Sequence, residues 1–411
     1  MTIAATASPT VRSPAVPLIL VVVAGCVIAA ITNGIRTSFG LFTLPATADL
    51  GLSREAWGMA MAIQNLVWGL AQPFAGAIAD KQGTARVIIA GLAFYAAGLL
   101  LMVISPTALL LNLTAGVLCG VGIAASSFSI VMIAFGRNVP QEKRPLIFGV
   151  ATAASSFGQF AFAPIGQGFI SAYGPTTALL LLSGFVALVP ILAASLSGKG
   201  FSADTEPAQS VRQALTQAMR HPSYLLLMSG FFVCGFHIAF ISTHLPPYLS
   251  DLGLSTSLAA WSLSLIGLFN VIGAYSSGLL GGVYPRRLLL SGIYLGRGVA
   301  FTLFVLIPAS PVTVIVFSAT LGLLWLSTVP LTSGLVALMF GTRHVGMLFG
   351  LVFFSHQVGA FAGALLGGIV YEATGNYDLM WVLCIVLSVA AGLVHLPIRE
   401  RRAAELVVSP A

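Results

Sequence analysis

The chain has 411 residues, of which 58% are hydrophobic and only 7% are charged, and its formal net charge is +7. A soluble globular protein carries roughly 25% charged residues, so this composition excludes a soluble fold. A bilayer solvates apolar surface, and a spanning helix needs about 20 apolar residues. The sequence therefore predicts an all-α integral membrane protein.

Apolar segments separated by short polar links predict twelve transmembrane helices. The first apolar run is too long for the hydrophobic region of a signal peptide, so we interpret it as the first helix. The cysteines occur singly, which predicts neither a metal site nor a disulfide framework. The helices are expected at residues 17–46, 55–79, 85–105, 107–136, 145–173, 175–196, 222–248, 256–283, 287–308, 311–340, 346–374 and 377–397.

The longest polar stretch runs from Ser197 to His221 and divides the predicted spans six and six. We interpret it as a solvated linker with a short amphipathic helix at about 208–219. The expected organisation is an N-terminal six-helix bundle at 1–196, a cytoplasmic linker at 197–221, and a C-terminal six-helix bundle with a short cytoplasmic tail at 222–411.

The basic residues of the loops predict the orientation. When twelve helices are threaded, fifteen loop cations fall on one side and only Arg54 falls on the other. The positive-inside rule makes the basic side cytoplasmic, which predicts an inner-membrane protein with both termini in the cytoplasm and no binding to nucleic acid. The fifteen are Arg12, Lys81, Arg86, Arg137, Lys143, Arg144, Lys199, Arg212, Arg220, Arg286, Arg287, Arg343, Arg399, Arg401 and Arg402.

An internal repeat relates the predicted fifth and eleventh helices at an offset of 201 residues. Such a repeat predicts two pseudo-symmetric halves with a substrate site at their interface, near the middle of the membrane. We interpret the repeated glycines as positions where helices approach closely, not as ligands. The pairs are Phe148-Gly149 with Phe349-Gly350, and Gly158, Phe160, Ala161, Gly166 and Gly174 with Gly359, Phe361, Ala362, Gly367 and Gly375.

Between the second and third helices, residues 76–86 read GAIADKQGTAR. This segment resembles the loop signature of the major facilitator superfamily, G-x-L-A-D-[RK]-x-G-[RK]-[RK], although residues 84 and 85 lack the basic pair. The resemblance implies two six-helix bundles around a central cavity and a gating role for this loop, with Arg137 as a partner for its acid. The matching residues are Gly76, Asp80, Lys81 and Gly83.

Two further segments look like the bacterial branch near monocarboxylate and oxalate/formate carriers. They are NGIRTSFGLF at 33–42 and FFVCGFHIAFISTHLPP at 231–247. The resemblance implies transport of small organic acids, although related proteins handle riboflavin and other solutes. The organic-acid carriers place a key arginine on helix 8, where this chain has only Asn270.

Two cations lie within the cores of predicted spans, Arg36 in helix 1 and Arg297 in helix 9, whereas none of the eleven acids does. A cation in the hydrocarbon layer costs about 2.5–3.5 kcal/mol and marks function by default. An anionic substrate would neutralise such a charge, and arginine can bind a carboxylate through two parallel hydrogen bonds. Each arginine also has a structural interpretation. The side chain of Arg36 could extend to the outer interface of the membrane, and that of Arg297 could donate hydrogen bonds to carbonyls of neighbouring helices.

Other polar residues within the spans are candidates for substrate contact. His237 and His356 could bind substrate or carry a proton, or be neutral core histidines. The amides and the indole are candidates for a cavity wall, although each is also a common bond between helices. The full candidate set around Arg36 is Asn33, Gln64, Gln159, His237, Asn270, Trp325, His356 and Gln357.

These observations predict a secondary transporter that moves a small organic anion by alternating access. Proton coupling through a histidine, proton transfer with the substrate, anion exchange and uniport all stay open. The alternatives are a carrier of a larger aromatic or weakly charged solute, such as a riboflavin-like vitamin or a drug, and a sensor that binds solute without moving it. The sequence contains no Walker loop or catalytic triad, so we expect no enzymatic activity and no cofactor. We also expect a monomer.

Overall fold

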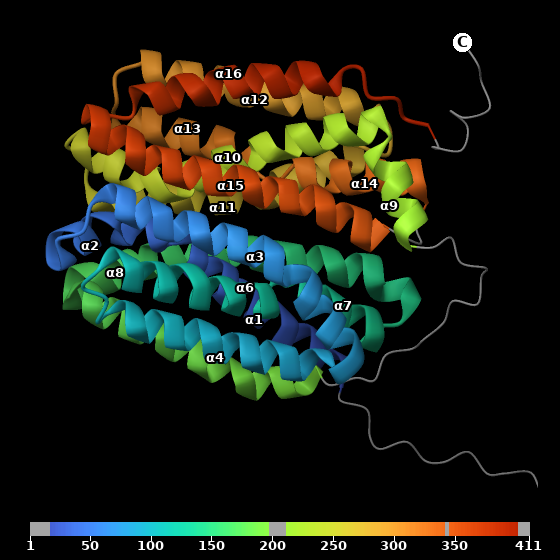
Figure 1. Cartoon of the computed structure of the whole chain (residues 1–411), viewed down its shortest axis with the longest axis horizontal. Coiled ribbons are helices and arrows are strands. Elements are labelled where there is room, and N and C mark those ends of the chain that lie inside the picture. The colour runs from blue at the N-terminus through green and yellow to red at the C-terminus, as the bar shows by residue number, and fades with distance from the viewer. Residues whose placement is uncertain (1–16, 197–210, 342–344, 402–411) are drawn as a thin grey trace, which may run out of the picture.

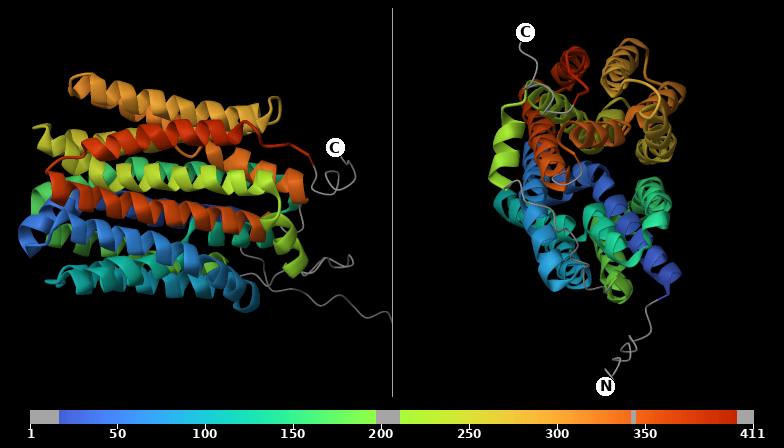
Figure 2. Two further views of the ribbon diagram at one scale, coloured as in Figure 1. Left: turned by 45° about the horizontal axis from the view of Figure 1, so that its top comes forward. Right: turned by 90° about the vertical axis from the view of Figure 1, so that its right-hand side faces the viewer.

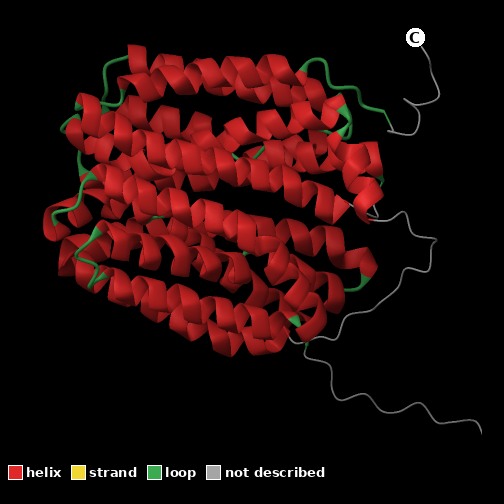
Figure 3. Cartoon of the chain, viewed as in Figure 1, coloured by secondary structure: helices red, strands yellow, loops and turns green. Residues whose placement is uncertain are grey.

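The computed structural model describes residues 17–196, 211–341 and 345–401, and all its regular elements are helical (Figure 3). Ten helical stretches are long and apolar enough to cross a membrane. One of them, Leu146–Leu196, counts twice because it breaks at Gly174, and α3 adds a further span of 29 residues. The described residues therefore confirm the twelve-helix prediction. Arg12, Lys199, Arg343 and Arg402 lie outside them, as does most of the predicted linker.

The first half of the chain forms the lower layer in Figure 1. Its elements are α1 Leu18–Thr37, η1 Phe39–Phe42, α2 Thr43–Leu50, α3 Arg54–Gln82, α4 Thr84–Met102, α5 Ala108–Leu111, η2 Asn112–Leu118, α6 Cys119–Ser126, α7 Phe128–Asn138, η3 Gln141–Lys143, α8 Arg144–Ala193 and η4 Ala194–Leu196.

The second half forms the upper layer. Its elements are α9 Val211–Met219, α10 Pro222–Asp251, α11 Thr256–Leu280, α12 Arg286–Leu306, α13 Pro311–Leu324, α14 Thr328–Phe340, α15 Val345–Thr374 and α16 Asp378–His395. The buried apolar residues make two large clusters, one built mainly from each half. The halves meet where α3 lies beside α15 and where α8 lies beside α11 (Figures 1 and 2).

Three predicted helices are present as single membrane-crossing stretches, but each is interrupted within its length. The span at 17–46 changes from α1 to η1 at Ser38. The span at 107–136 breaks at Ser127, whose ψ of 161° is extended. The span at 311–340 breaks between α13 and α14. Polar side chains of neighbouring helices bind at two breaks, because Gln72 Oε1 accepts from Ser127 Oγ at 3.0 Å and Asn270 Oδ1 accepts from Leu326 N at 2.9 Å.

The internal repeat is visible in the packing. A Cβ on Gly158 would overlap the carbonyl oxygen of Ala30, and a Cβ on Gly359 would overlap that of Phe232. Gly174 and Gly375, paired by the repeat, both end a helix with positive φ values of 81° and 74°. Close approach of helices is confirmed at Gly158 and Gly359, whereas Gly174 and Gly375 are turn positions, which the sequence did not predict. The prediction was wrong for Gly149 and Gly350, where no atom lies within 4 Å of a Cβ position.

Candidate functional site

A cluster of charged and aromatic residues joins the two halves at one end of the bundle. Arg54, the first residue of α3, donates from Nη1 and Nη2 to the carboxylate of Asp251 on α10, at 2.6 and 2.7 Å. Its backbone N–H donates to Glu372 Oε1 on α15 at 2.8 Å. Its guanidinium lies 3.7 Å from the ring centroid of Tyr371. We call Arg54, Asp251, Tyr371, Glu372 and the neighbouring Tyr377 the Arg54 cluster.

Tyr377 extends this cluster into the second half. Its hydroxyl accepts from Arg54 Nη1 at 3.3 Å and lies 3.3 Å from His244 Nδ1. The other ring nitrogen of His244 lies 2.8 Å from the carbonyl of Ala364 and donates to it. Burial raises the pKa of the Tyr377 hydroxyl above its ordinary value although Arg54 opposes the shift, so the hydroxyl stays protonated.

The backbones of the two halves also touch at the Arg54 end. A Cβ on Gly40 of η1 would overlap the carbonyl oxygen of Ser242 on α10, and one on Gly58 of α3 would lie 2.6 Å from that of Ala364 on α15. At the opposite end, Gly149 and Gly350 have no atom within 4 Å of a Cβ position. The structure is therefore closed between the halves at the Arg54 end.

The opposite end carries the predicted gating loop. Arg137 Nη2 lies 2.5 Å from Asp80 Oδ1, and Arg137 Nη1 donates to the carbonyl of Ala79 at 2.8 Å. Asp80 and Arg137 were expected to pair, and this pairing is present. Gly83 ends α3 with a φ of 95° that favours glycine, while Lys81 is exposed. Both members of the ion pair belong to the first half, so the pair does not itself join the halves.

Arg36 lies in the last turn of α1, where the free carbonyls of a helix end favour a cation. It is half-buried, and its Nε is buried without a hydrogen-bond partner. Its guanidinium lies 5.0 Å from the ring centroid of Trp68 on α3, and Nη2 donates only a long bond of 3.5 Å to Asn33 Oδ1. Within the described residues no carboxylate forms an ion pair with Arg36.

Trp68 connects Arg36 to the second half. Its ring meets that of Phe353 on α15 at 5.4 Å between centroids and at 69°. Phe353 in turn stacks on His356, with centroids 5.7 Å apart and planes at 9°. His356 Nδ1 lies 3.3 Å from Gln357 Oε1, while Nε2 of both residues is buried without a partner. A series of ring contacts through Trp68 and Phe353 therefore connects Arg36 to His356.

Four predicted amides bind neighbouring helices. Asn33 Nδ2 donates to the carbonyl of Ser155 at 3.0 Å, and Gln64 Nε2 to that of Ala115 at 2.8 Å. Gln159 and Asn270 join the halves, because Gln159 Nε2 donates to the carbonyl of Leu263 at 3.3 Å and Asn270 Nδ2 to Ser156 Oγ at 3.0 Å. Of the four, only Asn33 contacts Arg36 among the bonds of the described residues.

His237, Trp325 and Arg297 lie inside the second half. His237 is fully buried, with Nε2 3.1 Å from the carbonyl of Cys384 on α16. Arg297 is also fully buried, and it donates from Nη2 to the carbonyls of Leu324, at 2.7 Å, and Trp325. Arg297 therefore caps the free carbonyls where α13 ends. This is the second of the two roles that the sequence allowed, an anchor to carbonyls of a neighbouring helix.

Sequence reasoning missed Trp68, the residue that Arg36 faces. A signal was available, since Asn65, Trp68 and Gln72 recur at intervals of three and four and so share one face of α3. A tryptophan within an apolar helix is more often a core residue, however, and its contact with Arg36 depends on tertiary packing.

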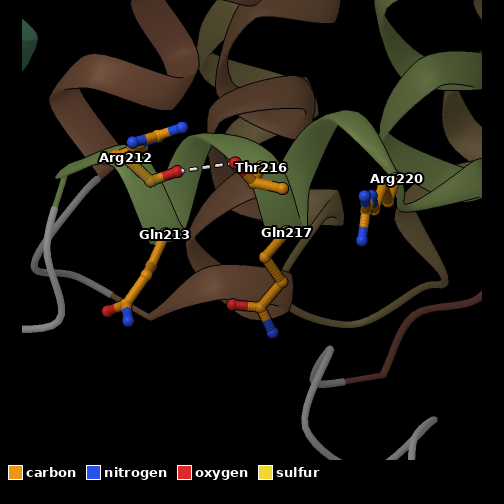
Figure 4. Close-up of a pocket in the computed structure, with 5 residues that line it drawn as sticks. All are labelled: Arg212, Gln213, Thr216, Gln217 and Arg220. Carbon is orange, nitrogen blue, oxygen red and sulfur yellow. Dashed lines mark hydrogen bonds between the residues drawn. The ribbon is translucent and has the colours of Figure 1, made fainter.

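A surface hollow lies along α9, apart from these contacts (Figure 4). This helix falls within the predicted amphipathic segment at 208–219. It exposes both arginines of the hollow, and Thr216 Oγ1 bonds back to the carbonyl of Arg212 at 2.8 Å. The residues that line it are Arg212, Gln213, Thr216, Gln217 and Arg220, none of which was predicted to touch substrate.

Comparison with known proteins places the chain in a family. The family model described as Major Facilitator Superfamily matches residues 25–331. The chain belongs to this superfamily. It is therefore a multi-pass membrane transporter and not an enzyme, and the family resemblance of the loop at 76–86 is confirmed.

Two curated relatives illustrate its place within the superfamily. Monocarboxylate transporter 13 of Rattus norvegicus is 28% identical over 382 residues, which cover 90% of this chain and 86% of the relative. An uncharacterized MFS-type transporter, YcxA, of Bacillus subtilis (strain 168) is 24% identical over 373 residues, covering 89% of this chain and 91% of the relative.

A solved structure shares the fold. The crystal structure of a D-xylose-proton symporter superposes with a TM-score of 0.72 over 93% of this chain and 97% of that chain, at 12% identity. At this identity the likeness concerns the arrangement of helices alone.

Proposed function

We propose that this member of the major facilitator superfamily carries a small organic anion of the monocarboxylate type by alternating access, and that Arg36 binds its carboxylate. The observation that carries the proposal is the unneutralised Arg36, half-buried at the interface with a buried Nε that has no partner. A substrate carboxylate would supply both the missing charge and the missing acceptor. The relatives named monocarboxylate transporters support the same class.

The second candidate substrate class, a neutral aromatic solute, fits Arg36 less well. Such a solute would cover the ring of Trp68 but leave the guanidinium without a counter-charge. His356 and Gln357 supply two further polar atoms without partners, suited to a second substrate oxygen or hydroxyl. The charge pattern of the loops favours the inner membrane with the Asp80 end in the cytoplasm. A coupled proton, a monomeric state and a gating role for the Asp80 loop belong to this proposal.

Uptake into proteoliposomes tests the proposal. Radiolabelled lactate, pyruvate and phenylacetate are offered to the wild-type protein, Arg36→Ala and Arg212→Ala, the last being an exposed cation on α9. A hydrogen bond to a charged group contributes about 1.5–3 kcal/mol, so Arg36→Ala should raise KM for the transported acid about 10- to 100-fold. Arg36→Lys should restore part of the affinity, because it keeps charge without the planar fork. Equal uptake by the two alanine variants would overturn the anion site.

A further inference from the structure

The interface beside Arg36 is lined by aromatic carbon. Trp68 and Phe353 are each half-buried, although both lie between the two halves and not in the core of either. We call these two side chains the aromatic wall. Their planes meet at 69°, so neither ring is stacked flat on the other. Ligand sites in proteins are mostly apolar, with a few polar groups that fix orientation, and the wall with Arg36 has this composition.

The polar edge of Trp68 is already occupied. Its Nε1 donates to Gln72 Oε1 at 2.9 Å, and the same oxygen accepts from Ser127 Oγ at 3.0 Å. The indole is therefore held in one orientation and its N–H is not available to a ligand. Since the Arg36 guanidinium lies over this ring at 5.0 Å from its centroid, what Trp68 offers a ligand is the apolar ring surface next to that charge.

These contacts set a requirement on the substrate beyond its charge. A two- or three-carbon acid bound to Arg36 leaves the wall uncovered, whereas an aromatic ring attached close to the carboxylate covers it. Aromatic pairs gain stability beyond the area that they bury, through offset or edge-to-face contacts. A saturated ring of the same size gains the burial alone.

We infer that the preferred substrates are aryl monocarboxylates, with the ring one or two bonds from the carboxylate, bound by Arg36 at the acid and by the aromatic wall at the ring. This inference rests on the proposed anion site and narrows its substrate class. His356 stacks on Phe353, and because its Nδ1 donates to Gln357 Oε1, its unpaired Nε2 is an acceptor. The unpaired Nε2 of Gln357 is a donor, so the two residues suit a ring hydroxyl and a ring carbonyl respectively.

Binding of three matched acids tests the inference by titration calorimetry of the purified protein. The acids are acetate, cyclohexylacetate and phenylacetate, the last two differing only in the aromaticity of the ring. Wild-type protein should bind phenylacetate up to about tenfold more tightly than cyclohexylacetate, and acetate more weakly than both. Trp68→Leu should narrow the difference in affinity between the two ring acids, because only Phe353 of the wall remains. Trp68→Phe, which keeps an aromatic ring, should retain most of the preference.

The control is Trp261→Leu, which removes a tryptophan 46% exposed on the surface of α11 and should leave the ratio unchanged. Cyclohexylacetate binding as tightly as phenylacetate, or an unchanged ratio in Trp68→Leu, would overturn the inference. If acetate or lactate still depended on Arg36, the proposed anion site would survive that result. No binding of any acid to the wild type would overturn both.

Discussion

Removing one charge from the Arg54 cluster should open that end of the transporter. Asp251→Asn removes the carboxylate that accepts two hydrogen bonds from Arg54, at 2.6 and 2.7 Å. Hydrogen bonds to charged groups contribute about 1.5–3 kcal/mol each. The Asp251 side chain is 32% exposed and that of Arg54 10%, so solvent screening reduces the sum. A net loss of about 2 kcal/mol corresponds to roughly a 30-fold shift toward the state open at this end.

Labelling of a buried cysteine measures the shift. Thr43 is fully buried at this end, and its Oγ1 donates to the carbonyl of Thr243 across the interface at 3.3 Å. In a background without the native cysteines, Thr43→Cys should react with an impermeant maleimide up to about 30-fold faster when Asp251→Asn is added. Asp49→Asn, an exposed acid at the same end, is the matched control. Equal rates in the two variants would refute the assignment of Arg54 and Asp251 as the closing contact.

Four other substitutions, one of them a control, test the roles of a buried arginine, a packed glycine and the Asp80 ion pair. Arg297→Ala should lower stability by about 1–3 kcal/mol, because it leaves buried carbonyls at a helix end without a donor, and the melting temperature in detergent measures this loss; an unchanged value would contradict the capping role. Gly359→Ala should destabilise the fold by about 1–3 kcal/mol, while Gly149→Ala, with open space around it, should melt as the wild type does. Asp80→Asn should cost less than about 1 kcal/mol yet slow uptake, and an unchanged uptake rate would argue against gating by the pair with Arg137.

The fold was predictable because it depends on features that can be read along the sequence, namely the length of apolar segments and an internal repeat. Apolar length gives the spans, and the repeat of Gly158 in Gly359 and of Gly174 in Gly375 gives the two halves. The breaks at Ser127 and before Thr328 were not predicted. Neither break contains a proline or glycine, and both depend on amides that reach them from other helices.

The candidate site was predictable only where charge marks it. Arg36 was found because a cation within a span is costly. Trp68 was not, because an indole in an apolar helix carries no charge signal and its position against Arg36 is set by packing. For Arg297 the sequence allowed either a site or an anchor, and the choice depends on where α13 ends.

The breaks in the two halves have a mechanical consequence. The offset of 201 residues relates Ser127 to Thr328, the first residue of α14, so each half has a potential hinge at the same place. Gln72 holds the first hinge and also holds the ring of Trp68. Asn270 holds the second and also donates to Ser156 in the opposite half. Bending at either break would therefore disturb one of these two amides, and through it either the ring of Trp68 or the bond of Asn270 to the opposite half.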